Sequence, residues 1–155
     1  YMSIHQHDPN ANELWTYYRN VIEWVRLTFT TYRKEMKGID WGELYDTFNT
    51  EIYDTDKLEQ EIQTLMMDDD VTNKKGIYTY ILNRDERFLN IRAFDRRDAR
   101  AAYEKQHHKC AICGEEFEFE QMHADHITPW SKGGKTTPNN CQMLCRDCNL
   151  KKGNQ

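Results

Sequence analysis

The sequence has few residues that interrupt regular structure and no long apolar segment. It contains seven Gly and three Pro among 155 residues, 38% of its residues are hydrophobic, and its mean hydropathy is −0.97. No stretch approaches the roughly 20 apolar residues that cross a bilayer, so a membrane-spanning protein is excluded. Aromatic residues make up 12% of the chain, which argues against a disordered or low-complexity polypeptide. We expect a globular fold.

An overall excess of positive charge is also lacking, since the formal net charge is −5. The charge is unevenly distributed, however. Residues 1–94 carry 11 Lys and Arg against 17 Asp and Glu, whereas residues 95–155 carry 10 against 9. Within the second part, residues 128–155 have five basic residues and a single acidic one, a local charge of +4. A polyanion would be bound there.

Cysteine is absent before position 110, and all five cysteines lie between residues 110 and 148. An odd number of closely spaced cysteines indicates metal binding in a reducing compartment rather than a disulfide framework. The N-terminus lacks the pattern of a secretory signal, and Tyr1 before Met2 suggests an expression-derived residue. We expect an intracellular, cytoplasmic protein whose residues 1–10 are flexible or expression-derived.

The first part of the chain, residues 1–94, is predicted to be a helical domain. Apolar residues recur every three or four positions from residue 12 to about 36, which is typical of an amphipathic helix, with Gly38 ending it. Asp40 can cap a short helix that follows, Thr55 or Asp56 can cap another, and a further helix is predicted to begin near Lys75. The acidic run at 68–70 is read as a solvated loop or cap rather than a metal site.

The second part, residues 95–155, is predicted to be a small module with a lead-in helix over 95–106. Alternating apolar residues after Cys113, at positions 117, 119, 122, 124 and 127, indicate strands. Gly133 and Gly134 mark a loop, and the composition of residues 141–152 is typical of a short terminal helix. The predicted class is therefore α+β, a helical region followed by a small zinc-bound module, and residues 85–94 are read as an irregular linker or short strand.

Two C-x2-C motifs carry the clearest chemical signal. They are separated by 31 residues, and their members are Cys110, Cys113, Cys145 and Cys148. Four thiolates at about 2.3 Å complete the tetrahedral shell of zinc and leave no place for water, so the predicted ion is structural. A redox C-x-x-C is the alternative. Cys141 lies outside both motifs and is read as a small buried residue.

Between the two motifs lie residues that a purely structural zinc site does not need. Asp125 offers a hard oxygen ligand for a divalent metal such as Mg²⁺, and Asn149 can supply a second one. His126 is suited to act as a general base. Adjacent residues in a strand point to opposite faces, so the strand must end or bulge there for both side chains to reach one phosphate. His123 is either a further ligand or a surface histidine.

These residues resemble the HNH (ββα-metal) endonuclease family, whose zinc-containing members combine two C-x2-C motifs with a D-H-I-x-P segment, a Gly-rich loop and an Asn. Here the matching segments are Asp125 to Pro129, Gly133-Gly134, Asn140, and Leu144 to Lys152. The resemblance covers roughly residues 108–153. It implies that His126 is the general base, that Asp125 and Asn149 bind the catalytic metal, that Asn140 fixes the loop that orients the histidine, and that Lys152 contacts phosphate. An acidic residue often precedes the Asp by two positions, where this chain has His123.

Residues 12–106 resemble, more weakly, the helical segment that precedes the HNH module in restriction-type proteins with a ParB-like nuclease module. The sequence thus predicts a DNA endonuclease that uses Mg²⁺ or Mn²⁺ beside a structural zinc, acts in restriction or anti-phage defence, and is a homodimer or a piece of a longer multidomain protein. Two alternatives stay open, a non-catalytic zinc-stabilised nucleic-acid-binding module and a protein-interaction segment. Phosphate contacts are expected from a basic set, Lys132, Lys135, Arg146, Lys151 and Lys152.

Overall fold

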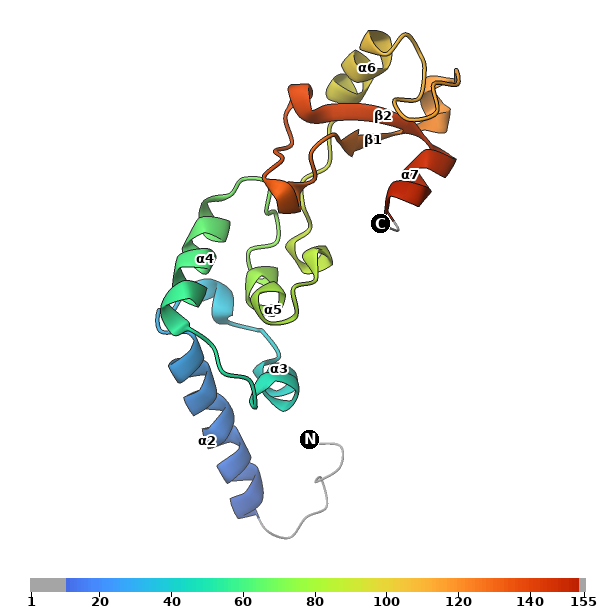
Figure 1. The fold of residues 1–155 in the computed structure, drawn as a ribbon. Helices are drawn as coiled ribbons and strands as arrows, with labels where there is room; N and C mark the ends of the chain where they lie inside the picture. The colour runs from blue at the N-terminus through green and yellow to red at the C-terminus, as the bar shows by residue number, and fades with distance from the viewer. Residues whose placement is uncertain (1–10, 154–155) are drawn as a thin grey trace. The chain divides into compact units, whose positions relative to one another are not determined.

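The structure is a computed structural model that describes residues 11–153 (Figure 1). The chain divides into two compact units, residues 1–90 and residues 91–155, with the boundary four positions before the one drawn from charge and composition. The residues 1–10 that were expected to be flexible lie outside the described part. No helix within residues 11–153 has the length and apolar character needed to cross a bilayer.

The first unit is helical, as predicted. Its helices are α2 (Ala11–Thr28), α3 (Trp41–Phe48), α4 (Thr55–Met67) and α5 (Gly76–Asn83), with short 3-10 helices η1 (Lys34–Met36) and η2 (Glu86–Leu89). The core contains an aromatic cluster in which the Phe29 ring lies 5.4 Å from Trp41 and 5.3 Å from Tyr78. Tyr78 is fully buried, as is Ile62 on α4.

Two details of this unit differ from the sequence prediction. The first helix ends at Thr28 rather than near Met36, because Thr28, Thr30 and Thr31 are β-branched and lower the helix propensity of this stretch. The cap of α4 is Asp54, whose carboxylate accepts a hydrogen bond from the Lys57 amide at 3.2 Å, and not Thr55 or Asp56. The predicted Asp40 cap of α3 is confirmed by the 3.1 Å bond from the Glu43 amide.

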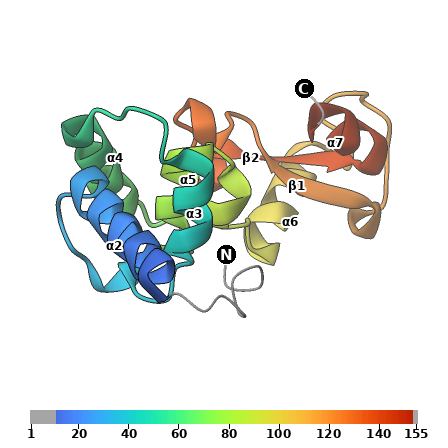
Figure 2. The same cartoon turned by 90° about the horizontal axis from the view of Figure 1, so that it is seen from below.

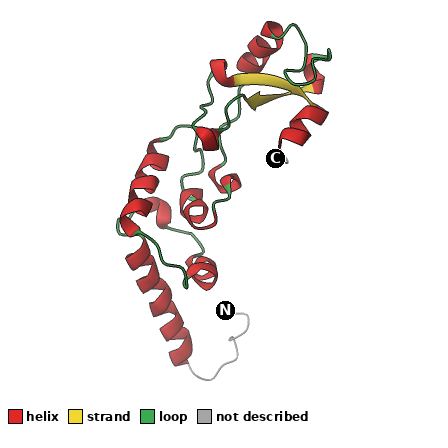
Figure 3. Ribbon diagram, viewed as in Figure 1, coloured by secondary structure: helices red, strands yellow, loops and turns green. Residues whose placement is uncertain are grey.

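The second unit is built on one antiparallel pair of strands, β1 (Met122–His126) and β2 (Cys141–Cys145), between two helices, α6 (Arg96–Lys105) and α7 (Arg146–Gly153). Helices α6 and α7 lie on opposite sides of the strand pair in both views (Figure 1 and Figure 2). Figure 3 shows that this pair is the only sheet in the described residues. The predicted α+β class and the lead-in helix over 95–106 are confirmed.

Strand β2 was not predicted, since residues 141–152 were assigned to one helix. Residues 141–145 are instead extended and pair with β1, and the helix begins only at Arg146. Both faces of this strand are covered: Met143 and Leu144 are 1% and 0% exposed, so the segment is nearly continuous in apolar character and shows no alternation. The predicted strand at Phe117 and Phe119 is also wrong, because residues 119–121 form a 3-10 helix, η3.

Candidate zinc site and strand-end site

The four cysteines of the two C-x2-C motifs converge on one point. Their sulfur atoms all lie within 4.8 Å of one another, and the Sγ atoms of Cys113 and Cys145 are 3.9 Å apart. Tetrahedral zinc with Zn–S bonds of about 2.3 Å places sulfurs about 3.8 Å apart. The donor set and its spacing therefore fit a metal such as zinc. It is the one group of three or more His, Cys, Asp or Glu donors found in the described part of the chain.

The electrostatics of the quartet also favour a bound cation. Burial raises the pKa of Cys110, but hydrogen bonds from backbone amides, first that of Cys145 at 3.4 Å, outweigh it and bring the pKa to about 6. Burial and then the neighbouring sulfurs raise the pKa of Cys148 to about 12. Backbone amides thus stabilise the Cys110 thiolate, while burial and the neighbouring sulfurs oppose ionisation of Cys148 unless a cation is present.

The same pattern argues against a redox pair. A redox C-x-x-C motif needs an accessible cysteine with a lowered pKa. Here the cysteine with the lowered pKa, Cys110, is only 3% exposed, and the exposed Cys113 has its pKa raised above the usual value. Cys141 is buried away from the quartet, where burial raises its pKa to about 11, as expected for a small core residue.

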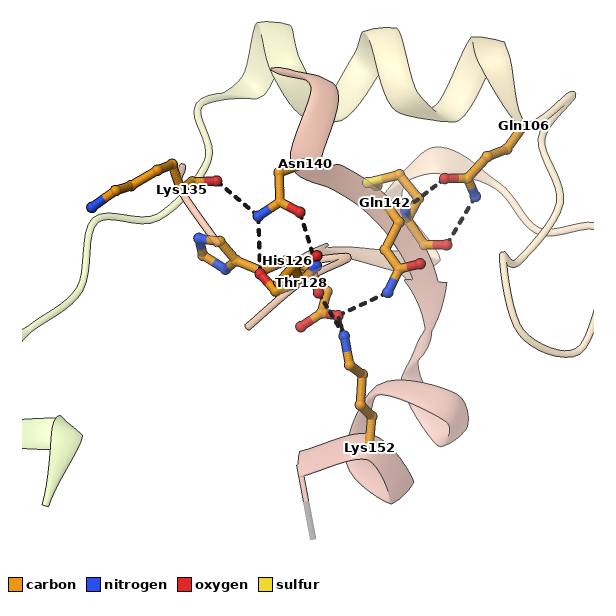
Figure 4. Close-up of polar contacts among 9 residues, drawn as sticks. Gln106, His126, Thr128, Lys135, Asn140, Gln142 and Lys152 are labelled. Atoms are coloured by element: carbon orange, nitrogen blue, oxygen red, sulfur yellow. Dashed lines mark hydrogen bonds and ion pairs between the residues drawn. The ribbon is translucent and has the colours of Figure 1, made fainter. Parts of the chain in front are cut away.

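The side chain of Gln106 links the end of α6 and the segment before the first cysteine motif to β2. Its amide nitrogen donates to the Lys109 carbonyl at 2.7 Å. Its amide nitrogen also donates to the Met143 carbonyl at 2.9 Å, and its carbonyl oxygen accepts from the Met143 amide at 2.8 Å (Figure 4). Gly114 closes the motif with a φ of +73°, a conformation that favours glycine. The zinc site is thereby joined to the strand that carries the second motif.

Asp125 lies on the face of β1 that is turned toward α7. Its carboxylate accepts a hydrogen bond from Gln142 at 3.1 Å and forms an ion pair with the Lys152 ammonium, which also donates to the His126 carbonyl at 2.6 Å (Figure 4). Both side chains of the ion pair are about a quarter exposed. The position therefore attracts a cation, and a hard divalent ion fits its oxygen donor.

The imidazole of His126 lies on the opposite face. Its ring is 4.5 Å from that of Phe94, and its Nε2 is 2.9 Å from the Thr136 hydroxyl. The strands pair residue by residue from Met122 with Cys145 to His126 with Cys141, so β1 ends at the histidine without a bulge. The two neighbouring side chains thus emerge on either side of a strand end.

The loop after β1 is shaped by Asn140. Its side-chain oxygen accepts from the Thr128 amide at 2.8 Å, and its nitrogen donates to the carbonyls of Thr128 at 3.0 Å and Lys135 at 2.8 Å (Figure 4). A Cβ atom added to Gly134 would lie 1.7 Å from the Thr128 carbonyl oxygen, so only glycine fits there. One amide therefore closes both ends of the loop that follows His126.

The remaining predicted residues lie along β1, on the loop after it and on α7, and they differ in exposure. Asn149 is half-buried on α7, one turn before Lys152, so the two share the helix face that contacts β1. His123 is exposed and lines a hollow with Arg146 and Asp147, apart from any three-donor group in the described residues. The exposed members of the predicted basic set are Lys132, Lys135, Arg146 and Lys151. Lys152 instead contacts Asp125.

Four residues with clear roles in these contacts were not singled out from the sequence: Phe94, Gln106, Thr136 and Gln142. Thr136 is 2% exposed and lies 10 residues after the histidine that it contacts. Gln142 is opposite Asp125 in the strand pair, a relation that becomes visible only once β2 is known. No spacing signal in the sequence marks these residues.

Comparison with known families agrees with this geometry. Residues 110–155 match the HNH endonuclease family. The match begins at the first cysteine and contains both C-x2-C motifs, β1, β2 and α7, and it supports a nuclease-type function for this part of the chain, with DNA as the partner on which HNH nucleases act. No curated protein matches the chain. The predicted resemblance of residues 12–106 to ParB-like fusion proteins gains no support from the HNH match and stays a prediction.

Proposed function

We propose that residues 91–155 hydrolyse DNA phosphodiester bonds at the end of β1. The observation that carries this proposal is the strand end itself, where the adjacent residues Asp125 and His126 emerge on opposite faces of β1 inside a region that matches HNH endonucleases. Their Cα atoms are about 3.8 Å apart, so a phosphate placed beyond the last strand pair can contact both side chains.

Asp125 and Asn149 would hold a divalent cation such as Mg²⁺ or Mn²⁺. When bound, such an ion supplies positive charge to the phosphate and to the leaving oxygen. In the structure, the ammonium group of Lys152 contacts the Asp125 carboxylate, where the metal ion would bind. Release of Lys152 from the carboxylate would leave a positive side chain beside the substrate, which reconciles this ion pair with the predicted phosphate contact.

His126 would take the proton from the attacking water. The loop fixed by Asn140 keeps the main chain after the histidine in place, since the amide nitrogen of Ile127 donates to the Asn140 carbonyl at 2.9 Å. Exposed basic residues on the loop and on α7 would bind flanking phosphates. A role in restriction or defence, and assembly as a dimer or within a longer protein, remain predictions from the sequence.

One observation favours the second candidate, a zinc-stabilised DNA-binding module without cleavage. Asp125 is neutralised by Lys152, and the imidazole of His126 lies on the other face of the strand. In that case the basic loop and α7 would bind DNA, and no group at the strand end would act on it.

A plasmid-nicking assay with Mg²⁺ or Mn²⁺ distinguishes the nuclease from the non-catalytic DNA-binding module. The parent chain should nick, and His126→Ala should slow nicking by about 10²–10⁴-fold while zinc content and thermal unfolding stay unchanged. His123→Ala is the matched control and should nick within a fewfold of the parent rate. Nicking by His126→Ala at the parent rate would refute the mechanism, and a parent inactive with every divalent ion would favour the binding module.

A further inference from the structure

Thr136 is the most buried polar residue at the strand end, and its hydroxyl lies between two groups. It is 2% exposed, its Oγ1 donates to the Arg92 carbonyl at 3.1 Å, and the same oxygen lies 2.9 Å from Nε2 of His126. A hydroxyl has one hydrogen to donate and two lone pairs to accept. The Arg92 carbonyl can only accept, so that bond uses the hydroxyl hydrogen and leaves the oxygen as an acceptor toward the histidine.

The direction of the second bond follows from the first. If Thr136 accepts, Nε2 of His126 must carry the hydrogen, and the neutral imidazole then has its unprotonated nitrogen at Nδ1. We propose that Thr136 is a positioning residue that sets the tautomer and the orientation of His126, so that Nδ1 is the atom that receives the proton of the attacking water. This inference rests on the proposed function and deepens it.

The contacts around Thr136 explain why it can impose this arrangement. Arg92 donates from Nη2 to the Thr136 carbonyl at 2.7 Å, so residues 92 and 136 bond reciprocally through two separate pairs of atoms. The Phe94 ring, 4.5 Å from the imidazole at an interplanar angle of 44°, restricts the rotation of His126. Both Arg92 and Phe94 precede the part of the chain that matches the HNH family, but they belong to the same compact unit.

The test uses two substitutions of similar size. Thr136→Val keeps the shape and removes the hydroxyl, whereas Thr136→Ser keeps the hydroxyl and removes a methyl group. The tautomer is measured by long-range ¹H–¹⁵N correlation of the histidine rings in the zinc-bound chain, with the His126 signals assigned by their loss in His126→Gln. The parent and Thr136→Ser should show Nε2 protonated, and Thr136→Val should show a mixture of the two tautomers.

Kinetics provide the second readout. Thr136→Val should lower kcat for nicking about five- to tenfold, the loss expected for one hydrogen bond, while KM for plasmid stays within twofold, and Thr136→Ser should restore kcat. A parent with Nδ1 protonated, or a Thr136→Val chain that keeps a single Nε2 tautomer, would overturn the proposal. So would equal losses of kcat in both variants. Because the spectrum needs no cleavage, an inactive parent refutes the nuclease without deciding the role of Thr136.

Discussion

The conformation of the loop at the strand end depends on steric fit as well as on hydrogen bonds. Gly134→Ala would place a Cβ atom 1.7 Å from the Thr128 carbonyl, so the loop backbone must move and the three Asn140 bonds must lengthen or break. We expect this variant to keep its zinc but to lose at least about tenfold in nicking rate, since small displacements of catalytic groups are costly.

Gly153→Ala is the matched control for that substitution, because nothing lies within 4 Å of the added Cβ atom. It should retain the parent rate and zinc content. Parent-like nicking by Gly134→Ala, measured beside this control, would mean that the loop does not position the active groups.

In the helical unit, the contact between Arg33 and Glu59 makes the stability depend on pH. Arg33 donates two hydrogen bonds to Glu59, one of them from Nη1 at 3.2 Å, and this holds the pKa of the Glu59 carboxyl below its usual value. A lowered folded-state pKa contributes stability that is present above the unfolded-state value, about 4.3, and is lost as the pH falls through the folded-state value.

Glu59→Gln should therefore destabilise the helical unit by about 1–3 kcal/mol near neutral pH, because it leaves the mostly buried Arg33 without its anionic partner. The loss should shrink as the pH falls below about 4.3. Urea unfolding as a function of pH measures both effects. Parallel stability curves for the parent and the variant across this range would contradict the account.

At the scale of elements, a metal bound by the four cysteines would join the segment after α6 to β2 and α7. Cys145→Ser should lose the metal and unfold the second unit, since structural zinc contributes on the order of 10–16 kcal/mol of apparent free energy in small zinc-binding peptides. Cys141→Ser, also buried in β2 but outside the quartet, should retain zinc. Metal analysis beside thermal unfolding tests the pair, and zinc retained by Cys145→Ser would refute the four-cysteine site.

Some of the helices and strands could be predicted from sequence patterns, and others could not. The helices α3 and α6 could be predicted because an apolar face and a capping aspartate are local features. Strand β2 could not, because its five residues are buried on both faces and their conformation depends on pairing with β1. The quartet follows from spacing alone, whereas the contacts of Thr136 and Gln142 depend on tertiary structure.

For the molecule as a whole, the uneven charge predicts where DNA binds. With four exposed basic residues of the predicted set in the second unit, the affinity for a short duplex should fall with salt with a log–log slope of about −3 to −4. Lys132→Ala should reduce the steepness of this slope by about 1. Lys57→Ala, exposed in the acidic helical unit, should leave it unchanged, and equal effects of both substitutions would contradict this assignment.

In the proposed mechanism, Asp125 and His126 act on the same phosphate from two sides of one strand end. The most direct measurement is a crystal structure of the chain with a DNA duplex and Mn²⁺, in which anomalous scattering locates the ion. We predict an ion bound by Asp125 and Asn149, with Lys152 displaced from the carboxylate, and the His126 imidazole facing the phosphate that this ion contacts. A phosphate bound away from the strand end, or an imidazole that faces no phosphate, would contradict the account.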